Sequence, residues 1–347
     1  MRVLYSFPYR IGRTGVGHTA WQQVNHLARD GVSVVLYCGK VERDLPPSVE
    51  VHENLVLGRL KLPMRLLGPM GTPLLHDLEV ARYLRATGKV PDLVHGWPLG
   101  SAHTFSAAAK RRVPTVLENC NSHIRNIVET LQPEYDRLGL RQRPRFLRDV
   151  RWVARHEVEY QRADFLACPS DFVADTFLAR GYLEAKLLRT QYGCDDAAMV
   201  RGAQDTDPGF KALFLGHGEP RKGLHHLLQA WGRASLPSGS QLSIAGSIEP
   251  NYMQVIQSLA ANEGVTFEGF VTEPARLLRQ SHVLVVPSLE EGSALVTYEA
   301  RTAASCSPPR RRGRWVTAAF STTSQEISRP CGSSWSCWQL TAGSTPS

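Results

Sequence analysis

The stretch from Leu284 to Ala300 constrains the fold of this chain more than any other. An apolar run at its start is typical of a short buried strand, and a polar loop and the beginning of a helix follow. Ser293 is predicted to cap that helix, with its hydroxyl accepting a hydrogen bond from an early backbone amide. Gly292 allows a ligand to approach the backbone closely. Because the first amides of a helix attract anions, the stretch predicts an anion-binding site.

Two carboxylates flank this predicted helix start, Glu291 just before the cap and Glu299 nearly two turns into the helix. They would approach a ligand from different depths, which suits a polyol attached to a phosphate. On this stretch alone, the alternative is that both glutamates are ordinary solvated charges of a helix.

A second stretch, from Phe214 to Leu224, has the same order of strand, glycine loop and helix start, with the adjacent cations Arg221 and Lys222. Together the two stretches resemble the donor-binding half of the family 4 (group 1) retaining glycosyltransferases of the GT-B superfamily. In that family a lysine before a glycine holds the donor diphosphate, and a Glu-x7-Glu pair grips the sugar and the ribose. The resemblance implies the diphosphate role for Lys222, the sugar role for Glu291 and the ribose role for Glu299.

The resemblance implies an α/β GT-B fold, with two Rossmann-like, doubly wound domains facing a cleft. We expect an acceptor-side domain over 1–195, a linker over 196–209, an incomplete donor domain over 210–303 and a non-family tail over 304–347. Strand and helix patterns alternate after Phe210, which predicts a parallel sheet with its loops at the strand carboxyl ends. The candidate donor-binding residues are Gly15, Gly17, Gly216, Arg221, Lys222, Phe270, Glu291, Gly292, Ser293 and Glu299.

The chain begins with a strand, a glycine-rich turn and a helix. The spacing of Gly12, Gly15 and Gly17 is not that of a dinucleotide fingerprint, and no acidic residue ends the second strand, so a nicotinamide enzyme is disfavoured. In the resembling family this loop faces the donor diphosphate. A simple tight turn is the alternative for these glycines.

Two histidines follow predicted strands of the first half. His95 is the acceptor-side candidate, because the resembling family often has a histidine at this position. The alternative is that His95 only packs in the domain or forms part of a turn. His123 joins Glu291 and Lys222 as a catalytic candidate by resemblance, although its surroundings depart from the usual Phe-His-Thr form. Phe270 resembles the family loop along the nucleotide base, and His217 stands where many relatives have an arginine.

Composition narrows the class of protein. The 347 residues are 42% hydrophobic and 21% charged, which is typical of a globular protein long enough for two cores. The net charge of +8 would attract phosphates of any kind. With no signal-peptide pattern and no apolar run long enough for a bilayer, we expect a cytoplasmic protein.

Seven cysteines without a Cys-x-x-Cys pair predict neither a disulfide framework nor a zinc site, so we expect no metal and no cofactor besides the nucleotide-sugar substrate.

Two further segments bear on the acceptor side. The segment 58–73 is predicted to be loop-prone, either touching the acceptor or a membrane or forming an insertion. The cationic run 137–155 carries Phe146, Val150 and Val153 at the spacing of one helical face. Such a helix can lie peripherally on the inner face of a membrane, or it can pack on the domain with solvated charges. We expect no nucleic-acid partner, because these aromatic residues are not on a strand platform.

The resemblance stops after Arg301. The following residues are rich in Ser, Pro and Arg and have no sustained strand or helix period, which predicts a disordered tail. We interpret the change as a shifted reading frame, and a genuine basic tail that binds a partner is the alternative.

The function predicted is sugar transfer from a nucleotide-diphospho-sugar with retention of configuration. The alternatives are an inactive remnant that only binds nucleotides and, less favoured, a nucleotide-sugar epimerase; the pyridoxal lysine motif of phosphorylases is not found.

Overall fold

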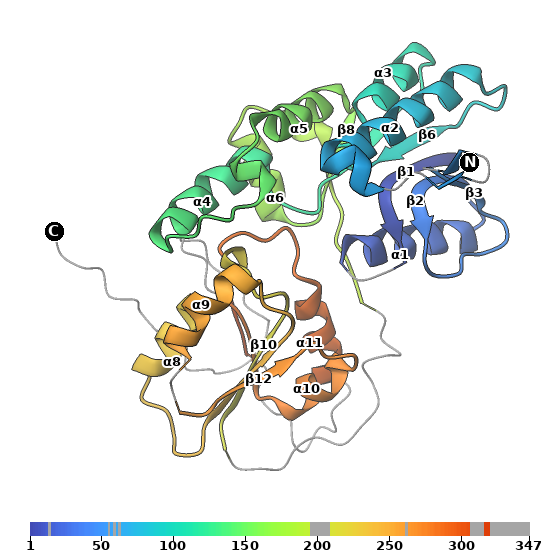
Figure 1. The fold of residues 1–347 in the computed structure, drawn as a ribbon. Helices are drawn as coiled ribbons and strands as arrows, with labels where there is room; N and C mark the ends of the chain where they lie inside the picture. The colour runs from blue at the N-terminus through green and yellow to red at the C-terminus, as the bar shows by residue number, and fades with distance from the viewer. Residues whose placement is uncertain are drawn as a thin grey trace. The chain divides into compact units, whose positions relative to one another are not determined.

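The computed structural model describes residues 1–12, 15–54, 56–57, 60–61, 64–194, 209–260, 263–305 and 316–319. The chain forms two compact units, coloured along the sequence in Figure 1. Unit 1 comprises Met1–Glu129 and Arg143–Tyr192, and unit 2 comprises Thr130–Gln142 and Gly193–Ser347. The second half of helix α4 (Ile124–Arg137) therefore belongs to unit 2, although it lies far before the predicted linker in the sequence.

Unit 1 is built on a parallel sheet with the strand order β3-β2-β1-β6-β7-β8-β9. Helix α1 covers one face, and α2, α3 and α5 cover the other (Figure 1). The order reverses between β1 and β6, so the loops after these two strands diverge to opposite faces. The strands are β1 (Arg2–Ile11), β2 (Ser33–Val41), β3 (Glu50–Glu53), β6 (Leu93–Gly96), β7 (Thr115–Glu118), β8 (Phe165–Cys168) and β9 (Leu187–Arg189). The helices are α1 (Val16–Arg29), α2 (Met64–Ala86), α3 (Ala102–Lys110), α5 (Val150–Arg162) and α6 (Asp171–Leu178), with 3-10 turns η1 (Arg145–Leu147) and η2 (Glu184–Lys186).

Two predictions for this half are wrong. The segment 58–73 is not a loop throughout, because α2 begins at Met64 and continues past a kink at Gly68, where φ is 67°. A short antiparallel pair, β4 (Val56–Leu57) and β5 (Leu60–Lys61), precedes it. The cationic run 137–155 is also not one helix: α4 ends in it, η1 carries Phe146, and α5 starts only at Val150.

Unit 2 contains a parallel sheet of order β12-β11-β10-β13-β14. Helices α8 and α9 lie on one face, and α10 and α11 lie on the other (Figure 1). The apolar residues of β10 and β13 pack with α10 and α11 in a core that includes Leu213, Leu278 and Leu284. The strands are β10 (Lys211–Leu215), β11 (Gln241–Ala245), β12 (Val265–Gly269), β13 (Val283–Val286) and β14 (Val316–Ala319). The helices are α8 (Leu224–Arg233), α9 (Pro250–Leu259), α10 (Pro274–Gln280) and α11 (Leu295–Ser305), with a 3-10 turn η3 (Pro220–Lys222).

Strand β14 corrects the prediction that the tail is without structure. It pairs in parallel with β13, with Val316 opposite Val283 and Ala319 opposite Val286. The β-branched residues Val316 and Thr317 suit a strand, and the edge of β13 offers them unpaired backbone groups. The rest of the tail after Ser305, at 306–315 and 320–347, and residues 196–208 of the predicted linker lie outside the described residues.

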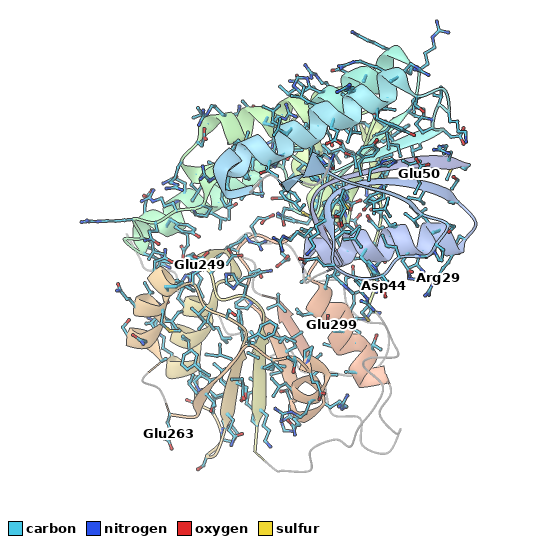
Figure 2. The ribbon with its side chains drawn as sticks, turned by 45° about the vertical axis from the view of Figure 1, so that its right-hand side comes forward. Arg29, Asp44, Glu50, Glu249, Glu263 and Glu299 are labelled. Carbon is cyan, nitrogen blue, oxygen red and sulfur yellow. The ribbon has the colours of Figure 1, made fainter. Side chains whose placement is uncertain are left out.

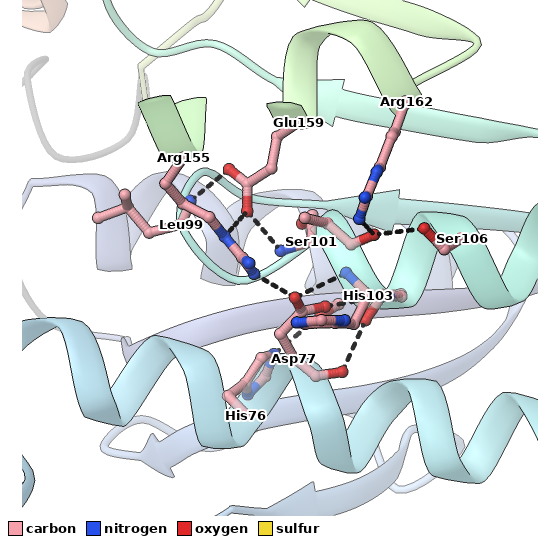
Figure 3. Close-up of polar contacts among 12 residues, drawn as sticks. His76, Asp77, Leu99, Ser101, His103, Ser106, Arg155, Glu159 and Arg162 are labelled. Carbon is pink, nitrogen blue, oxygen red and sulfur yellow. Dashed lines mark hydrogen bonds and ion pairs between the residues drawn. The ribbon is translucent and has the colours of Figure 1, made fainter. Parts of the chain in front are cut away.

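A buried ionic network ties three segments of unit 1 together (Figure 3). Asp77 of α2 accepts hydrogen bonds from the amides of His103 and Thr104, both at 2.8 Å, in the first turn of α3. Glu159 of α5 accepts one from the amide of Ser101 at 2.8 Å. Arg155 pairs with both carboxylates, whose side chains are fully buried, so the network joins α2, α3 and α5.

We predict that Arg155→Met destabilises unit 1 by about 3–5 kcal/mol, because it leaves two buried carboxylates without their cation. Arg151→Met on the same helix is the matched control, since the Arg151 side chain is 80% exposed and an exposed ion pair contributes at most about 1 kcal/mol. Urea unfolding of both variants measures the difference. Equal effects of the two substitutions would contradict the structural role of Arg155.

Candidate functional site

The candidate site of unit 2 lies where the strand order reverses, between β10 and β13. In a doubly wound sheet the loops after two such strands run to opposite faces and open a crevice at the carboxyl edge. The loop 216–223 follows β10, and the loop 287–294 follows β13. These are the two stretches that the sequence singled out.

Backbone contacts hold the two loops together. Gly223 has a φ of 66°, and a Cβ at this position would meet the carbonyl oxygen of Pro287 at 2.0 Å, so only glycine fits. The amide of Leu289 donates a hydrogen bond of 2.9 Å to the carbonyl oxygen of Arg221. The 3-10 turn η3 thus presents Arg221 and Lys222 directly against the β13 loop.

Five charged side chains meet at this junction. Lys222 Nζ pairs with Glu291 Oε2, and both side chains are about one-fifth exposed. Arg221 Nε donates to Glu219 Oε1 at 3.0 Å, and its Nη1 lies 3.4 Å from Glu290 Oε2 and 3.9 Å from Glu291 Oε1. Arg221, Lys222 and Glu291 therefore converge within unit 2.

The pKa shifts show how strongly these charges interact. Burial alone would lower the pKa of Arg221, but Glu219, Glu291 and Glu290 raise it above its ordinary value. Burial would raise the pKa of Glu291, yet Lys222 and Arg221 hold it below its ordinary value. Both groups are thus charged at neutral pH, and the site is a compact cluster of opposite charges.

This arrangement can exchange partners. Two cations face three carboxylates, and Glu290 is fully buried whereas Lys222 and Glu291 reach solvent. An anionic ligand with more charge and more acceptor oxygens than a carboxylate would offer Lys222 a stronger partner. Such an exchange would leave the Glu291 carboxylate as a hydrogen-bond acceptor.

Other predicted donor residues lie at the same edge of the sheet. Gly216 directly follows β10, and nothing lies within 4 Å of where its Cβ would be. Phe270 directly follows β12 and is 70% exposed, which leaves its ring available for stacking. Gly292 is buried.

The predicted cap at Ser293 is wrong. Helix α11 begins two residues later, at Leu295, and the Ser293 hydroxyl lies 2.8 Å from the hydroxyl of Tyr298. The side chain therefore turns toward the helix surface instead of its first amides.

Glu299 lies in α11, as labelled in Figure 2. Burial raises the pKa of its carboxyl group. Its carboxylate makes no hydrogen bond or ion pair among the described residues, so this half-buried acceptor is available to a ligand.

Unit 1 has a polar network at its own reversal point. Glu118, fully buried at the end of β7, accepts hydrogen bonds from His95 Nε2 at 3.0 Å, Tyr192 Oη at 2.6 Å and Gln23 Nε2 at 3.2 Å. The His95 ring stacks on Tyr5 with a centroid distance of 4.8 Å. Burial would raise the pKa of Glu118, but the contact with His95 lowers it. His95 is thus held by a carboxylate at the end of β6.

The glycine loop lies after β1, beside β6. Gly15 precedes α1 with a φ of 64°, and Gly17 lies in the first turn of α1. A Cβ on Gly17 would meet the carbonyl oxygen of Arg10 at 2.5 Å, so the turn itself requires this glycine.

His123 is enclosed by aromatic side chains. Its ring centroid lies 4.9 Å from that of Tyr160, 5.0 Å from Phe177 and 5.8 Å from Tyr182. Its Nδ1 accepts a hydrogen bond of 3.2 Å from the amide of Arg125. Burial lowers the pKa of His123 to about 4. These surroundings favour a packing role, and the catalytic role stays a prediction.

Two family models match the chain. A glycosyl transferase 4-like domain matches residues 14–193, and a model described as glycosyl transferases group 1 matches residues 209–306. The chain belongs to the glycosyl transferase 4-like family, whose model matches more than half of it, and its second half also matches the group 1 model. No curated protein sequence gives a match.

Solved structures similar to this glycosyltransferase share its architecture. Sucrose-phosphate synthase from Thermosynechococcus elongatus is 18% identical with a TM-score of 0.61, and the match covers 87% of this chain and 79% of that one. WaaG, a glycosyltransferase involved in lipopolysaccharide biosynthesis, is 17% identical with a TM-score of 0.59 over 87% and 79% of the two chains. HepE from Anabaena, in complex with UDP-glucose, is 15% identical with a TM-score of 0.56 over 91% and 85%. The likeness confirms the predicted α/β GT-B fold.

Sequence reasoning missed two carboxylates of this glycosyltransferase. Glu290 adjoins Glu291 in sequence and was not distinguished from it, although only the structure shows it buried against Arg221. Glu118 was not among the candidates from the sequence. Its position after a buried strand, in the same sheet as His95, is the one signal that could have identified it.

We predict that His123→Phe retains the aromatic packing and removes a pH dependence of stability. Folding lowers the pKa of His123 from its ordinary 6.5 to about 4. Between these pH values the unfolded chain binds a proton that the folded chain does not, so the free energy of unfolding falls as the pH drops. The loss is on the order of 2 kcal/mol, since one pKa unit corresponds to about 1.4 kcal/mol. Urea unfolding of the wild type and the variant at pH 7 and pH 5 measures it. An unchanged pH dependence in the variant would show that the histidine is not buried as described.

Proposed function

We propose that this chain transfers a sugar from a nucleotide-diphospho-sugar to an acceptor with retention of anomeric configuration. The observation that supports this most is the contact of Lys222 with Glu291 at the reversal point of the unit 2 sheet. It joins a diphosphate-binding cation and a hydroxyl-binding carboxylate in one place. HepE, which shares the fold, is described in complex with UDP and with UDP-glucose, which supports a nucleotide-sugar donor.

Each residue has a role in this proposal. Arg221 and Lys222 neutralise the diphosphate as it leaves, and this electrostatic stabilisation does what a metal ion does in other transferases. Glu291 holds sugar hydroxyls, and the available carboxylate of Glu299 holds the ribose. The exposed ring of Phe270 lies along the base.

The remaining candidates contribute backbone or acceptor contacts. Gly216 and Gly292 let the donor approach the chain closely, as Gly15 and Gly17 do in unit 1. His95, fixed by Glu118, is the acceptor-side residue. No metal takes part in the transfer step as we propose it.

The second candidate function is nucleotide binding without turnover. The match to the group 1 model ends at residue 306, where the composition changes, and this favours a donor domain that lost later elements. We interpret the change as a shifted reading frame, and sequencing the coding DNA tests this: an alternative frame that encodes the missing family strands supports it, and its absence refutes it.

A membrane surface is the partner that we propose for the segment that runs from η1 to the start of α5. Arg145, Arg148 and Arg151 are exposed there, and the apolar side chain of Val150 is 82% exposed. Cationic and apolar groups together bind anionic lipid surfaces. The contact that we propose is peripheral. Among the described residues, no helix is long and apolar enough to span a bilayer. Co-sedimentation with anionic but not neutral vesicles tests the proposed contact, and equal recovery with both would refute it.

We predict that Lys222→Met weakens binding of a nucleoside diphosphate by about tenfold to a hundredfold, because a hydrogen bond to a charged group contributes about 1.5–3 kcal/mol. Arg233→Met is the matched control, since this exposed cation ends helix α8, which follows the turn that carries Lys222. Calorimetric titration with UDP, GDP, ADP and dTDP identifies the base and measures both variants.

This titration, run beside an assay of nucleotide-sugar hydrolysis, has three outcomes that separate the proposals. Binding with donor hydrolysis or transfer supports the enzyme. Binding without any turnover supports the remnant. If the wild type binds none of the four nucleotides, or if both variants bind alike, the assignment of Lys222 fails.

A further inference from the structure

A second cluster of charged and metal-ligating side chains lies in unit 2, away from the Lys222–Glu291 pair. It joins the second half of α4 to the first turn of α8. Glu134 Oε1 pairs with His225 Nε2 and lies 3.2 Å from His226 Nε2. One ligand atom from each of these three residues lies within 4.8 Å of the other two.

The geometry of the two histidines is unusual for simple ion pairing. His226 Nε2 is buried and has no hydrogen-bond partner of acceptable geometry, although it faces the carboxylate. The two imidazole rings lie close together, with centroids 4.1 Å apart. Two ring nitrogens that converge on one carboxylate oxygen would repel each other as imidazolium cations, whereas a shared metal ion would bind both in the neutral form.

An outer contact orients the buried histidine. The hydroxyl of Tyr252, in α9, hydrogen-bonds His225 at Nδ1. This contact leaves Nε2 directed at Glu134. Metal-binding histidines are generally held in this way, with the second ring nitrogen engaged by a polar group that sets ring orientation.

We propose that Glu134, His225 and His226 form a site for one divalent transition-metal ion of the zinc class. Two imidazole nitrogens and one carboxylate oxygen are the donor set that suits zinc, and a water molecule completes a tetrahedron. No cysteine takes part. A search of the sequence for Cys-x-x-Cys pairs, by which many zinc sites are found, therefore does not detect this site.

Arg137 is the charged group that the metal must accommodate. It contacts Glu134 through Nε at 3.1 Å from Oε2 and Nη2 at 2.6 Å from Oε1. Its side chain is 47% exposed, so it can retain Oε2 or turn to solvent while the metal takes Oε1. The arginine therefore competes for one oxygen and does not block the site.

The site has a structural consequence for the phosphate turn. Gly223 alone separates Lys222 from α8, whose second and third residues are His225 and His226. A metal ion there would fasten the start of α8 to α4, and so would limit the movement of the turn that presents Arg221 and Lys222. It would support the donor site without entering the transfer reaction.

The test uses the full chain after treatment with a chelator. Calorimetric titration with zinc chloride should give one equivalent bound, and zinc should raise the Tm. Glu134→Gln and His226→Gln should each weaken zinc binding at least tenfold and abolish the rise in Tm. His26→Gln is the matched control, because His26 is an exposed histidine of α1 in unit 1. Circular dichroism verifies that each variant is folded, and His225 is left intact because its buried ring also contacts Tyr252.

A cobalt spectrum distinguishes the ligands. Cobalt(II) bound by nitrogen and oxygen gives visible ligand-field bands without the intense near-ultraviolet band of a thiolate ligand. Bands that disappear in Glu134→Gln support the proposal. A thiolate band, or zinc affinity that is equal in the wild type, Glu134→Gln and His226→Gln, would overturn it, because the metal would then be held elsewhere and the three side chains would form only an ion pair.

Discussion

One electrostatic contact organises the site of unit 2: two loops that are far apart in the chain bring opposite charges together at the reversal point of a parallel sheet. Lys222 and Glu291 are 69 positions apart, and they meet because β10 and β13 are neighbours in the sheet. Gly223 makes the contact possible, since any side chain there would collide with Pro287. The backbone bond from Leu289 to Arg221 then fixes the two loops against each other.

This contact also explains how a cationic site can persist without its ligand. Unpaired cations in a partly buried turn would be costly, and the carboxylates of Glu219, Glu290 and Glu291 offset that cost. The fully buried Glu290 is suited to hold Arg221 permanently, while the partly exposed Glu291 is suited to leave Lys222. In the mechanism that we propose, such a site exchanges one anionic partner for another, and the protein does not have to create charge when the donor binds.

The sequence predicted the local elements of this site well and the side-chain contacts less well. The alternation of strands and helices after Phe210 was predicted from the sequence, because continuous apolar runs between turn signals define buried strands. The loop charges were identified by their spacing. The cap at Ser293 failed because the hydroxyl found Tyr298 instead, a contact that no capping pattern contains. Strand β14 was missed because its short run lies in a segment of polar composition and depends on the free edge of β13.

Contacts between distant segments were beyond sequence reasoning. Glu134 and His225 are 91 positions apart, so no spacing rule connects them, and the same holds for Asp77 and Arg155, which are 78 apart. The contact of Glu118 with His95 also required the structure. Strands were predicted before His95 and before His123, but only the pairing of β6 with β7 shows that the two side chains meet.

A double-mutant cycle on Lys222→Met and Glu291→Gln tests the central claim most directly. Unfolding free energies of the wild type, both single variants and the double variant give the coupling energy of the pair, first without ligand and then with a saturating nucleoside diphosphate. The account predicts a favourable coupling on the order of 1 kcal/mol without ligand, as for a partly exposed ion pair, and its loss when the diphosphate takes Lys222. A coupling that stays the same with the nucleotide bound would contradict the exchange of partners on which the proposed mechanism depends.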